Sequence, residues 1–367
     1  MSYISKLLTS KWGPVVTGII IGILAPVLVR LGNPANMGVC VVCFNRDIAG
    51  ALGLHQAAVV QYLRPEIIGF VGGSLAASLA FREFRPRTGS APFVRFILGV
   101  FAVFGALVFL GCPWRAYLRL SGGDWNAVAG ILGLTAGIAL GVLFLRKGYS
   151  LGRNRSTPSA AGWLMPSVML VLLVLLIAAP LFGRDAQGNP VGPIFFSAAG
   201  PGSQRAPILI SLAVGVLVGF IAQRSRFCTV GAIRETLLTR DTHLLRGVIA
   251  LIAAALVTNL ILGQFSPGFT GQPVAHASHI WNFLGMALAG LAFTLAGGCP
   301  GRQLILSGEG DGDSAVFITG MIVGAGFAHL FSIAASPAGP GPYSAAAVIT
   351  GLAVCTVIGL TMRESAA

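Results

Sequence analysis

Apolar stretches long enough to cross a bilayer recur along the whole chain, separated by short polar or glycine-containing segments. A membrane-spanning helix needs about 20 mostly apolar residues. The stretches that approach this length are Gly13–Leu31, Ile67–Phe81, Phe93–Gly111, Trp125–Leu145, Trp163–Phe182, Pro207–Gln223, Leu244–Gly263, Ile280–Gly297, Ala315–Phe331 and Tyr343–Met362. We interpret the first as a retained span, because it exceeds the apolar core of a typical signal peptide. The pattern predicts five spans in each half of the chain.

The composition supports this interpretation. Of the 367 residues, 55% are hydrophobic and only 10% are charged. Soluble domains carry about 25% charged residues, so this chain has too few polar side chains to cover itself in water. Short alternating strands, which are typical of a transmembrane barrel, are not seen. We therefore predict an all-α polytopic membrane protein surrounded by lipid, and we do not take the formal charge of +13 as a sign of nucleic-acid binding.

The basic residues are unevenly distributed between the loops. Cytoplasmic loops of membrane proteins are enriched in Lys and Arg. If the N-terminus is cytoplasmic and the chain crosses ten times, the opposite side keeps only seven of the 24 basic residues, namely Arg30, Arg46, Arg64, Arg115, Arg119, Arg184 and Arg205. The sequence thus predicts a multi-pass protein with both termini in the cytoplasm.

Two cysteine motifs occur once in each half. The segment GCPWR from Gly111 resembles GCPGR from Gly298, and CVVCFNRD from Cys40 resembles CTVGAIRE from Cys228. An odd number of spans per copy would invert the second copy, which is a known transporter architecture. We therefore predict two inverted repeats, 1–182 and 183–367, with re-entrant segments near 33–55 and 112–122 in the first and near 224–241 and 299–309 in the second.

The Gly-Cys-Pro sequence predicts the start of a helix. Proline is favoured at the first helical position, which places Cys112 and Cys299 at the caps. Each helix would run for about nine residues, or roughly 13 Å, which is near half of the hydrocarbon core. Such a half-helix presents free N–H groups to an anion, and Arg115 and Arg302 would share a face with the cysteines. A thiol is a weak donor, which favours passage over trapping.

Other roles for the cysteines remain open at this stage. A buried cysteine is often only a small hydrophobic residue, and we assign Cys355 to this class. Cys40 and Cys43 have the spacing of a redox pair, but Gly231 occupies the position of Cys43 in the second copy. A redox pair is therefore not built into the repeat.

The remaining polar residues have less specific interpretations. We favour ordinary ion pairs for Arg46 with Asp47 and for Arg234 with Glu235, over direct contact with a substrate. His276 and His279 are three residues apart, and we interpret them as solvated loop residues rather than metal ligands. We predict neither a metal nor a cofactor.

At these motifs the sequence resembles the YeeE/YedE family of bacterial inner-membrane proteins, which includes thiosulfate permease-like members. The stretch NMGVCVVCFNRDIAGALGLHQAAVVQYLRPEIIGF, together with FLGCPWRAYLRLSGGD, is more narrowly similar to a branch associated with selenium metabolism. The resemblance implies an hourglass-shaped helical protein in which waist cysteines pass thiosulfate along by transient S–H hydrogen bonds. Carried over to this sequence, those cysteines are Cys112, Cys228 and Cys299, with Cys40 as a fourth. It also implies a small cytoplasmic sulfur-carrier-like partner.

We therefore expect an inner-membrane transporter, not an enzyme, for a small sulfur- or selenium-containing anion. The expected pathway contains Cys40, Cys112, Cys228 and Cys299. The supporting residues are Cys43, Arg46, Arg115, Arg234 and Arg302. The alternative is a membrane thiol enzyme or relay subunit that works with a carrier protein, and a third hypothesis is a docking subunit for such a carrier.

Overall fold

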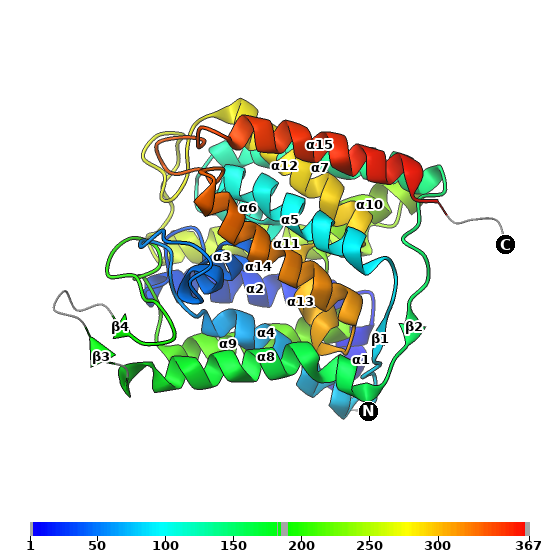
Figure 1. Cartoon of the computed structure of the whole chain (residues 1–367), viewed down its shortest axis with the longest axis horizontal. Coiled ribbons are helices and arrows are strands. Elements are labelled where there is room, and N and C mark those ends of the chain that lie inside the picture. Colours follow the sequence, from blue (N-terminus) through cyan, green and yellow to red (C-terminus); the bar gives the residue numbers. More distant parts are fainter. Residues whose placement is uncertain (1–2, 182, 185–189, 364–367) are drawn as a thin grey trace.

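The computed structural model describes residues 3–181, 183–184 and 190–363 as a bundle of helices whose long axes run broadly along one direction (Figure 1). Within these residues, nine helices are long and apolar enough to cross a membrane. They are α2 (Gly13–Arg30), α5 (Pro92–Phe109), α7 (Asn126–Arg146), α8 (Ser159–Ala178), α9 (Ile208–Ser225), α11 (His243–Ile261), α12 (His279–Ala296), α14 (Gly312–Leu330) and α15 (Ser344–Thr361). The predicted all-α polytopic membrane fold is confirmed.

The tenth predicted span corresponds to α4 (Pro65–Ala80), which has 16 residues and is shorter than the other nine. At 1.5 Å per residue it is about 24 Å long. It packs along α9, so it runs with the spanning helices.

The remaining elements are short. They are α1 (Tyr3–Thr9), α3 (Val41–Ala51), α6 (Pro113–Ser121), α10 (Thr229–Thr239), α13 (Pro300–Gly308), the 3-10 turn η1 (Ala179–Leu181), and four two-residue strands, β1 (Arg87–Thr88), β2 (Arg155–Ser156), β3 (Gly183–Arg184) and β4 (Pro190–Val191). Strands β1 and β2 pair antiparallel, as do β3 and β4. One short helix lies in each of the four segments expected to re-enter the membrane.

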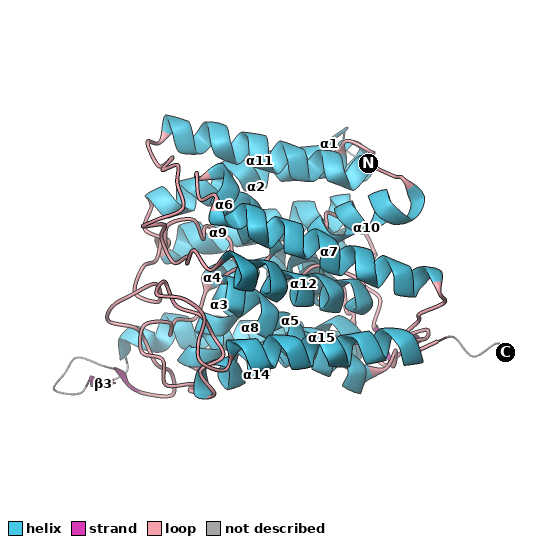
Figure 2. Ribbon diagram, turned by 90° about the horizontal axis from the view of Figure 1, so that it is seen from above, coloured by secondary structure: helices cyan, strands magenta, loops and turns pink. Residues whose placement is uncertain are grey.

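The long helices pair across the two halves of the chain. Helix α2 packs against α11, α4 against α9, α5 against α14 and α7 against α12. In the last pair Gly133 contacts Phe283 and Gly137 contacts Ala287, so both helices run in the same direction. Small residues allow two backbones to approach closely, which is how helices associate where no water drives their contact. Figure 2 shows α11 and α2 along one side of the bundle and α15 along the opposite side.

Both ends of the described chain lie at one end of the bundle. The N- and C-terminal labels are on the same side as β1 and β2, whereas β3 and β4 lie at the other end (Figure 1). An isolated bridge between Tyr149 and Arg363 ties the end of α15 to the segment after α7. The chain therefore enters and leaves the bundle on one side.

A test of the interhelical packing is the change Gly137→Ala. The added Cβ would lie 1.9 Å from the carbonyl oxygen of Ala287, so α7 and α12 must separate. We expect a loss of about 1–3 kcal/mol, the usual cost of overpacking, seen as a lower unfolding temperature in detergent. Gly72→Ala in α4 is the control, because its Cβ would meet nothing within 4 Å. Equal unfolding temperatures for the two variants would contradict this packing.

Candidate functional site

Four cysteines occupy the same structural position, the N-cap of a short helix. Cys40 precedes α3, Cys112 precedes α6, Cys228 precedes α10 and Cys299 precedes α13. Helix N-caps are usually Ser, Thr, Asp or Asn, whose oxygen accepts a backbone N–H of the first turn. Here sulfur accepts that bond in three cases, from the N–H of Cys43 at 3.3 Å, of Gly231 at 3.2 Å and of Arg302 at 3.4 Å. A soft, weakly bound atom thus lies at each helix start.

The four thiols form two pairs, one in each half of the chain. In the first thiol pair, Cys40 Sγ lies 3.8 Å from Cys112 Sγ. In the second thiol pair, the backbone N–H of Cys299 donates to Cys228 Sγ at 3.4 Å. All four side chains are buried. Each pair joins the starts of two short helices, α3 with α6 and α10 with α13.

The N-termini of α6 and α13 meet in the centre of the protein. Trp114, the second residue of α6, packs against Gly301, the second residue of α13, so closely that a Cβ at Gly301 would lie 2.6 Å from indole Cζ2. The indole ring also contacts the rings of Phe70 and Phe227, each with centroids 5.8 Å apart. The structure thereby brings the two Gly-Cys-Pro motifs, which are 187 positions apart, into contact at their helix starts.

The turn between each long helix and the half-helix that follows has the same geometry. Leu110 and Gly297 both have positive φ, at 63° and 94°. The next residue then bonds backward to the end of the long helix, from Gly111 N to the Ala106 oxygen at 2.8 Å and from Gly298 N to the Phe293 oxygen at 2.9 Å. This is the Schellman ending of a helix, and it ends α5 and α12 directly before the short helices α6 and α13.

Basic side chains bind the carbonyl groups that these endings leave free. After α5, Arg119 donates to the Phe109 oxygen at 2.8 Å and Arg115 donates to the Leu110 oxygen. After α12, Arg95 donates to the Ala296 oxygen and Arg234 to the Gly297 oxygen, both at 3.0 Å. The last carbonyl groups of a helix have no intrahelical partner, so these contacts stabilise the turn that follows each long helix.

The predicted site arginines therefore lie near the thiols, but their charges have partners in the protein. Arg115 also donates to the backbone oxygens of Asn36 at 3.1 Å and Val274 at 3.0 Å, and lies 3.6 Å from Cys43 Sγ. Arg302 pairs with Glu309 at 3.2 Å. A buried guanidinium must satisfy its donors, which explains why neither group is left free.

The two predicted ion pairs are confirmed. Arg46 binds Asp47 at 2.7 Å, and Arg234 binds Glu235 at 3.5 Å. The sequence did not identify the second partner of Asp47, which is Arg64 at 2.6 Å. This buried guanidinium also donates to the Pro201 and Gln204 oxygens, so it joins the start of α4 to the segment before α9.

The interpretation of His276 as a solvated residue was wrong. Its side chain is buried, and Nε2 lies 2.7 Å from the backbone oxygen of Val108, near the end of α5. It therefore belongs to the polar groups that support the broken helix. His279 is exposed, as expected, and its ring contacts Phe269.

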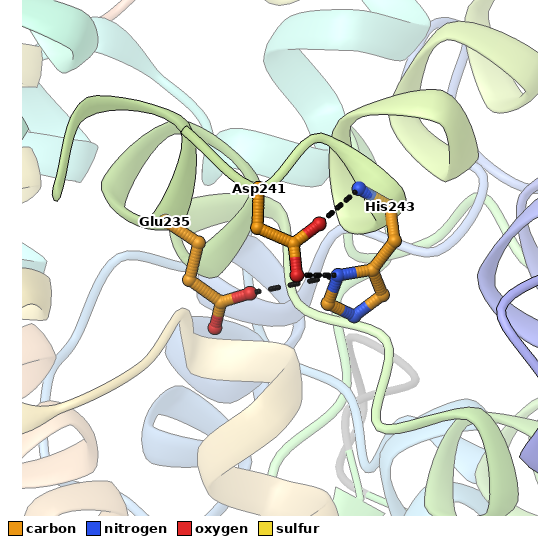
Figure 3. Close-up of side chains that lie close together, drawn as sticks. All are labelled: Glu235, Asp241 and His243. Carbon is orange, nitrogen blue, oxygen red and sulfur yellow. Dashed lines mark hydrogen bonds and ion pairs between the residues drawn. The ribbon is translucent and has the colours of Figure 1, made fainter. Parts of the chain in front are cut away.

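A second polar cluster lies away from the thiols, where α10 ends and α11 begins. His243 Nδ1 is 2.9 Å from a carboxylate oxygen of Asp241 and 3.9 Å from one of Glu235 (Figure 3). The backbone N–H of His243 also donates to Asp241 and lowers the pKa of its carboxyl. The geometry is that of a polar turn fixing the start of α11, which explains the cluster without a bound ion.

The first thiol pair can be tested by cross-linking a variant that retains only Cys40 and Cys112, with the other four cysteines changed to alanine. A sulfur–sulfur distance of 3.8 Å is closed to the disulfide length of about 2.05 Å by small side-chain rotations. We expect copper phenanthroline to oxidise both thiols to a disulfide, detected by intact-protein mass spectrometry as the loss of two hydrogens. A variant that retains Cys40 and Cys355 should stay reduced, because Cys355 lies in the outer helix α15. A reduced Cys40/Cys112 variant would contradict the geometry.

The sequence of this chain is similar to those of known membrane transport proteins. The family described as Sulphur transport matches residues 1–118 and 224–362. The "Thiosulfate transporter TsuA" of Spirochaeta thermophila is 31% identical to this chain over 103 residues, which cover 28% of this chain and 31% of that protein. The protein of the same name from Escherichia coli K12 is 28% identical over 103 residues, which cover 28% of this chain and 29% of that protein. A "Fluoride-specific ion channel FluC 2" from Synechococcus sp. CC9605 is 32% identical over 111 residues, covering 30% of this chain and 78% of that protein.

The chain thus spans about a third of the length of the thiosulfate transporters it matches. The family match is much wider, and its two segments contain all four N-cap cysteines. This chain therefore belongs to the sulphur transport family, the YeeE/YedE proteins.

Proposed function

We propose that this protein moves a small sulfur-containing anion, thiosulfate or a close chemical relative, across the membrane through its centre. The observation that carries the proposal is the meeting of two half-helix N-termini, each capped by a buried cysteine. Family membership and the names of the two matched thiosulfate transporters support the choice of substrate.

The proposed attraction comes from the helix starts rather than from free positive side chains. The N-terminus of a helix carries a partial positive charge and unpaired N–H groups, which suit an anion. Arg115 donates to neutral carbonyl groups and so contributes a positive potential without binding the substrate directly, whereas the charge of Arg302 is compensated by Glu309. Weak attraction of this kind lets an anion both enter and leave.

The proposed path runs from Cys40 and Cys112 to Cys228 and Cys299. Each pair brings two thiols to one place, so an anion passing from one pair to the other would exchange S–H hydrogen bonds stepwise. Cys43 would add a third thiol on the first side. Arg115 and Arg234 would hold backbone carbonyls around the path, and Arg46 and Arg302 would hold the carboxylates of Asp47 and Glu309. A selenium-containing anion has similar acceptor atoms and is a competing substrate to be tested.

We also propose that residues 1–182 and 183–367 are inverted repeats. The helix packing supports this. Helix α2 corresponds to α9 as the first span of a repeat, and α4 corresponds to α11 as the second, so a symmetry between the repeats turns the contact of α2 with α11 into that of α9 with α4. With both termini in the cytoplasm of a bacterium, the basic end of the bundle would face inward. A cytoplasmic sulfur-carrier-like protein would meet the transporter there.

The orientation is tested by labelling single cysteines in a background without native cysteines. The two substitutions are Asn154→Cys and Ala277→Cys. Position 154 precedes β2 at the end of the bundle where both termini lie, and position 277 precedes α12. Both positions are exposed. We expect a membrane-impermeant maleimide added to intact cells to label the cysteine introduced at 277 but not the one at 154. Lysed cells, in which both should react, provide the control. Labelling at 154 alone would reverse the orientation.

Transport is tested by uptake of labelled thiosulfate into proteoliposomes, with selenite, fluoride and sulfate as competitors. The double variant Cys112→Ala, Cys299→Ala should lose at least about tenfold in uptake, since each hydrogen bond to a charged group contributes about 1.5–3 kcal/mol. Cys355→Ala, in the outer helix α15, should retain normal uptake. Absence of thiosulfate flux in the unaltered protein would overturn the proposal, and normal flux in the double variant would overturn the thiol path.

A membrane thiol enzyme is the second candidate, favoured by the three thiols gathered at Cys40, Cys43 and Cys112. In that case a cysteine thiolate would attack the outer sulfur of thiosulfate, the S–S bond of thiosulfate would break, sulfite would leave, and a persulfide would remain on the cysteine. Intact-protein mass spectrometry after exposure to thiosulfate separates the two functions, because a hydrogen-bonding path leaves the mass of the protein unchanged.

A further inference from the structure

Trp114 is a buried side chain with an unused hydrogen-bond donor. The residue is only 1% exposed, and its indole Nε1 has no hydrogen-bond partner among the described residues. Buried tryptophans usually find a partner for this N–H, because an unmade hydrogen bond in the interior destabilises the fold. The lack of a partner calls for an explanation that packing of the ring does not provide.

The unused donor lies at the start of α13. Indole Nε1 is 3.1 Å from the position that a Cβ of Gly301 would occupy, in the first turn of that nine-residue helix. The same turn begins at Cys299, whose Sγ accepts the N–H of Arg302 at 3.4 Å. The indole N–H therefore adds a neutral donor beside the N–H of Gly301 and the thiol at this helix start, where Pro300 has no N–H and those of Arg302 and Gln303 already have acceptors.

A second unused group lies in the same region. Thr229 directly follows Cys228 at the start of α10, and its buried hydroxyl lies beside the thiol of Cys299 and has no nitrogen or oxygen partner among the described residues. The backbone of Cys299 donates to Cys228 Sγ, so the starts of α10 and α13 are in contact. Two orphaned polar groups thus accompany the second thiol pair.

The repeat explains why the donor occurs only once. Trp114 in the first motif corresponds to Gly301 in the second, and the ring of one fills the space that the other leaves empty. A tryptophan at both positions would not fit, because even a Cβ at Gly301 would lie 2.6 Å from the ring. The protein therefore places one indole at the contact between its halves, with its N–H toward α13.

We infer that Trp114 Nε1–H and the Thr229 hydroxyl, together with the backbone N–H of Gly301 in the first turn of α13, bind the oxygen atoms of the transported anion beside the second thiol pair. This deepens the proposed function and rests on it. The thiols of Cys228 and Cys299 contact the sulfur end of the anion. The indole N–H, the threonine hydroxyl and the backbone N–H donate hydrogen bonds to its oxygen atoms. The position thus selects anions that carry both a soft sulfur atom and hydrogen-bonding oxygens.

The change Trp114→Phe tests the donor because it keeps a ring against Phe70, Phe227 and Gly301 while removing the N–H. We expect the KM for thiosulfate uptake to rise about tenfold to a hundredfold, the usual effect of losing a hydrogen bond to a charged group. The control is Trp125→Phe, whose ring is 44% exposed and should leave the KM unchanged. An unchanged KM for Trp114→Phe, in a protein that transports thiosulfate, overturns the inference.

A binding measurement keeps this test separate from transport. In a variant with Trp12, Trp125, Trp163 and Trp281 changed to phenylalanine, Trp114 is the only fluorophore of its kind. Titration with thiosulfate should give a saturable change in its emission, and the additional change Thr229→Val should shift the midpoint about tenfold or more to higher concentration. If the unaltered protein shows no thiosulfate flux, the proposed transport function fails. The titration still decides whether thiosulfate binds beside Trp114. Emission that does not respond to thiosulfate overturns it.

Discussion

The need to satisfy backbone carbonyls where α5 and α12 stop inside the protein governs the rest of the structure. A helix that ends against other protein elements leaves carbonyl groups without intrahelical partners. Arg115, Arg119 and His276 bind those of α5, and Arg95 and Arg234 bind those of α12. These contacts hold the two half-helices at the angle that brings Cys112 and Cys299 to the centre. The thiols are placed by basic residues that do not themselves have to touch the substrate.

The same constraint explains the chemistry of the interior. Buried charges are tolerated only when they are paired and hydrogen-bonded, and the first half shows this in the pairing of Asp47 with both Arg46 and Arg64. At the other end of the bundle, Glu309 pairs with Arg226 and Arg302. The centre between these networks contains aromatic rings and thiols. It is a buried region in which a weak donor has a larger effect than it would in water.

Most of the fold was accessible from the sequence because spanning helices depend on a local property, the length of an apolar run. The caps at Cys112 and Cys299 were also accessible, since proline at the next position marks a helix start. The cysteine caps at Cys40 and Cys228 lack that proline and were recognised only as parts of a repeat. The partners of the basic residues were not predictable, because Arg95 and Ala296 are 201 positions apart and no periodicity links them. One signal was overlooked: aligning the two motifs sets Trp114 opposite Gly301, the pattern of a large residue filling the space of a small one.

The pairing of helices across the two halves has a consequence for the synthesis of the protein. Helices α2 and α4 emerge from the ribosome early, yet their packing partners α11 and α9 are encoded in the second half. Until those partners are inserted, the glycine-lined surfaces of the first half have no helix to pack against. The helices of the second half, in contrast, find their partners already in place. The interhelical packing of the first half can therefore be completed only after translation has delivered α9 and α11.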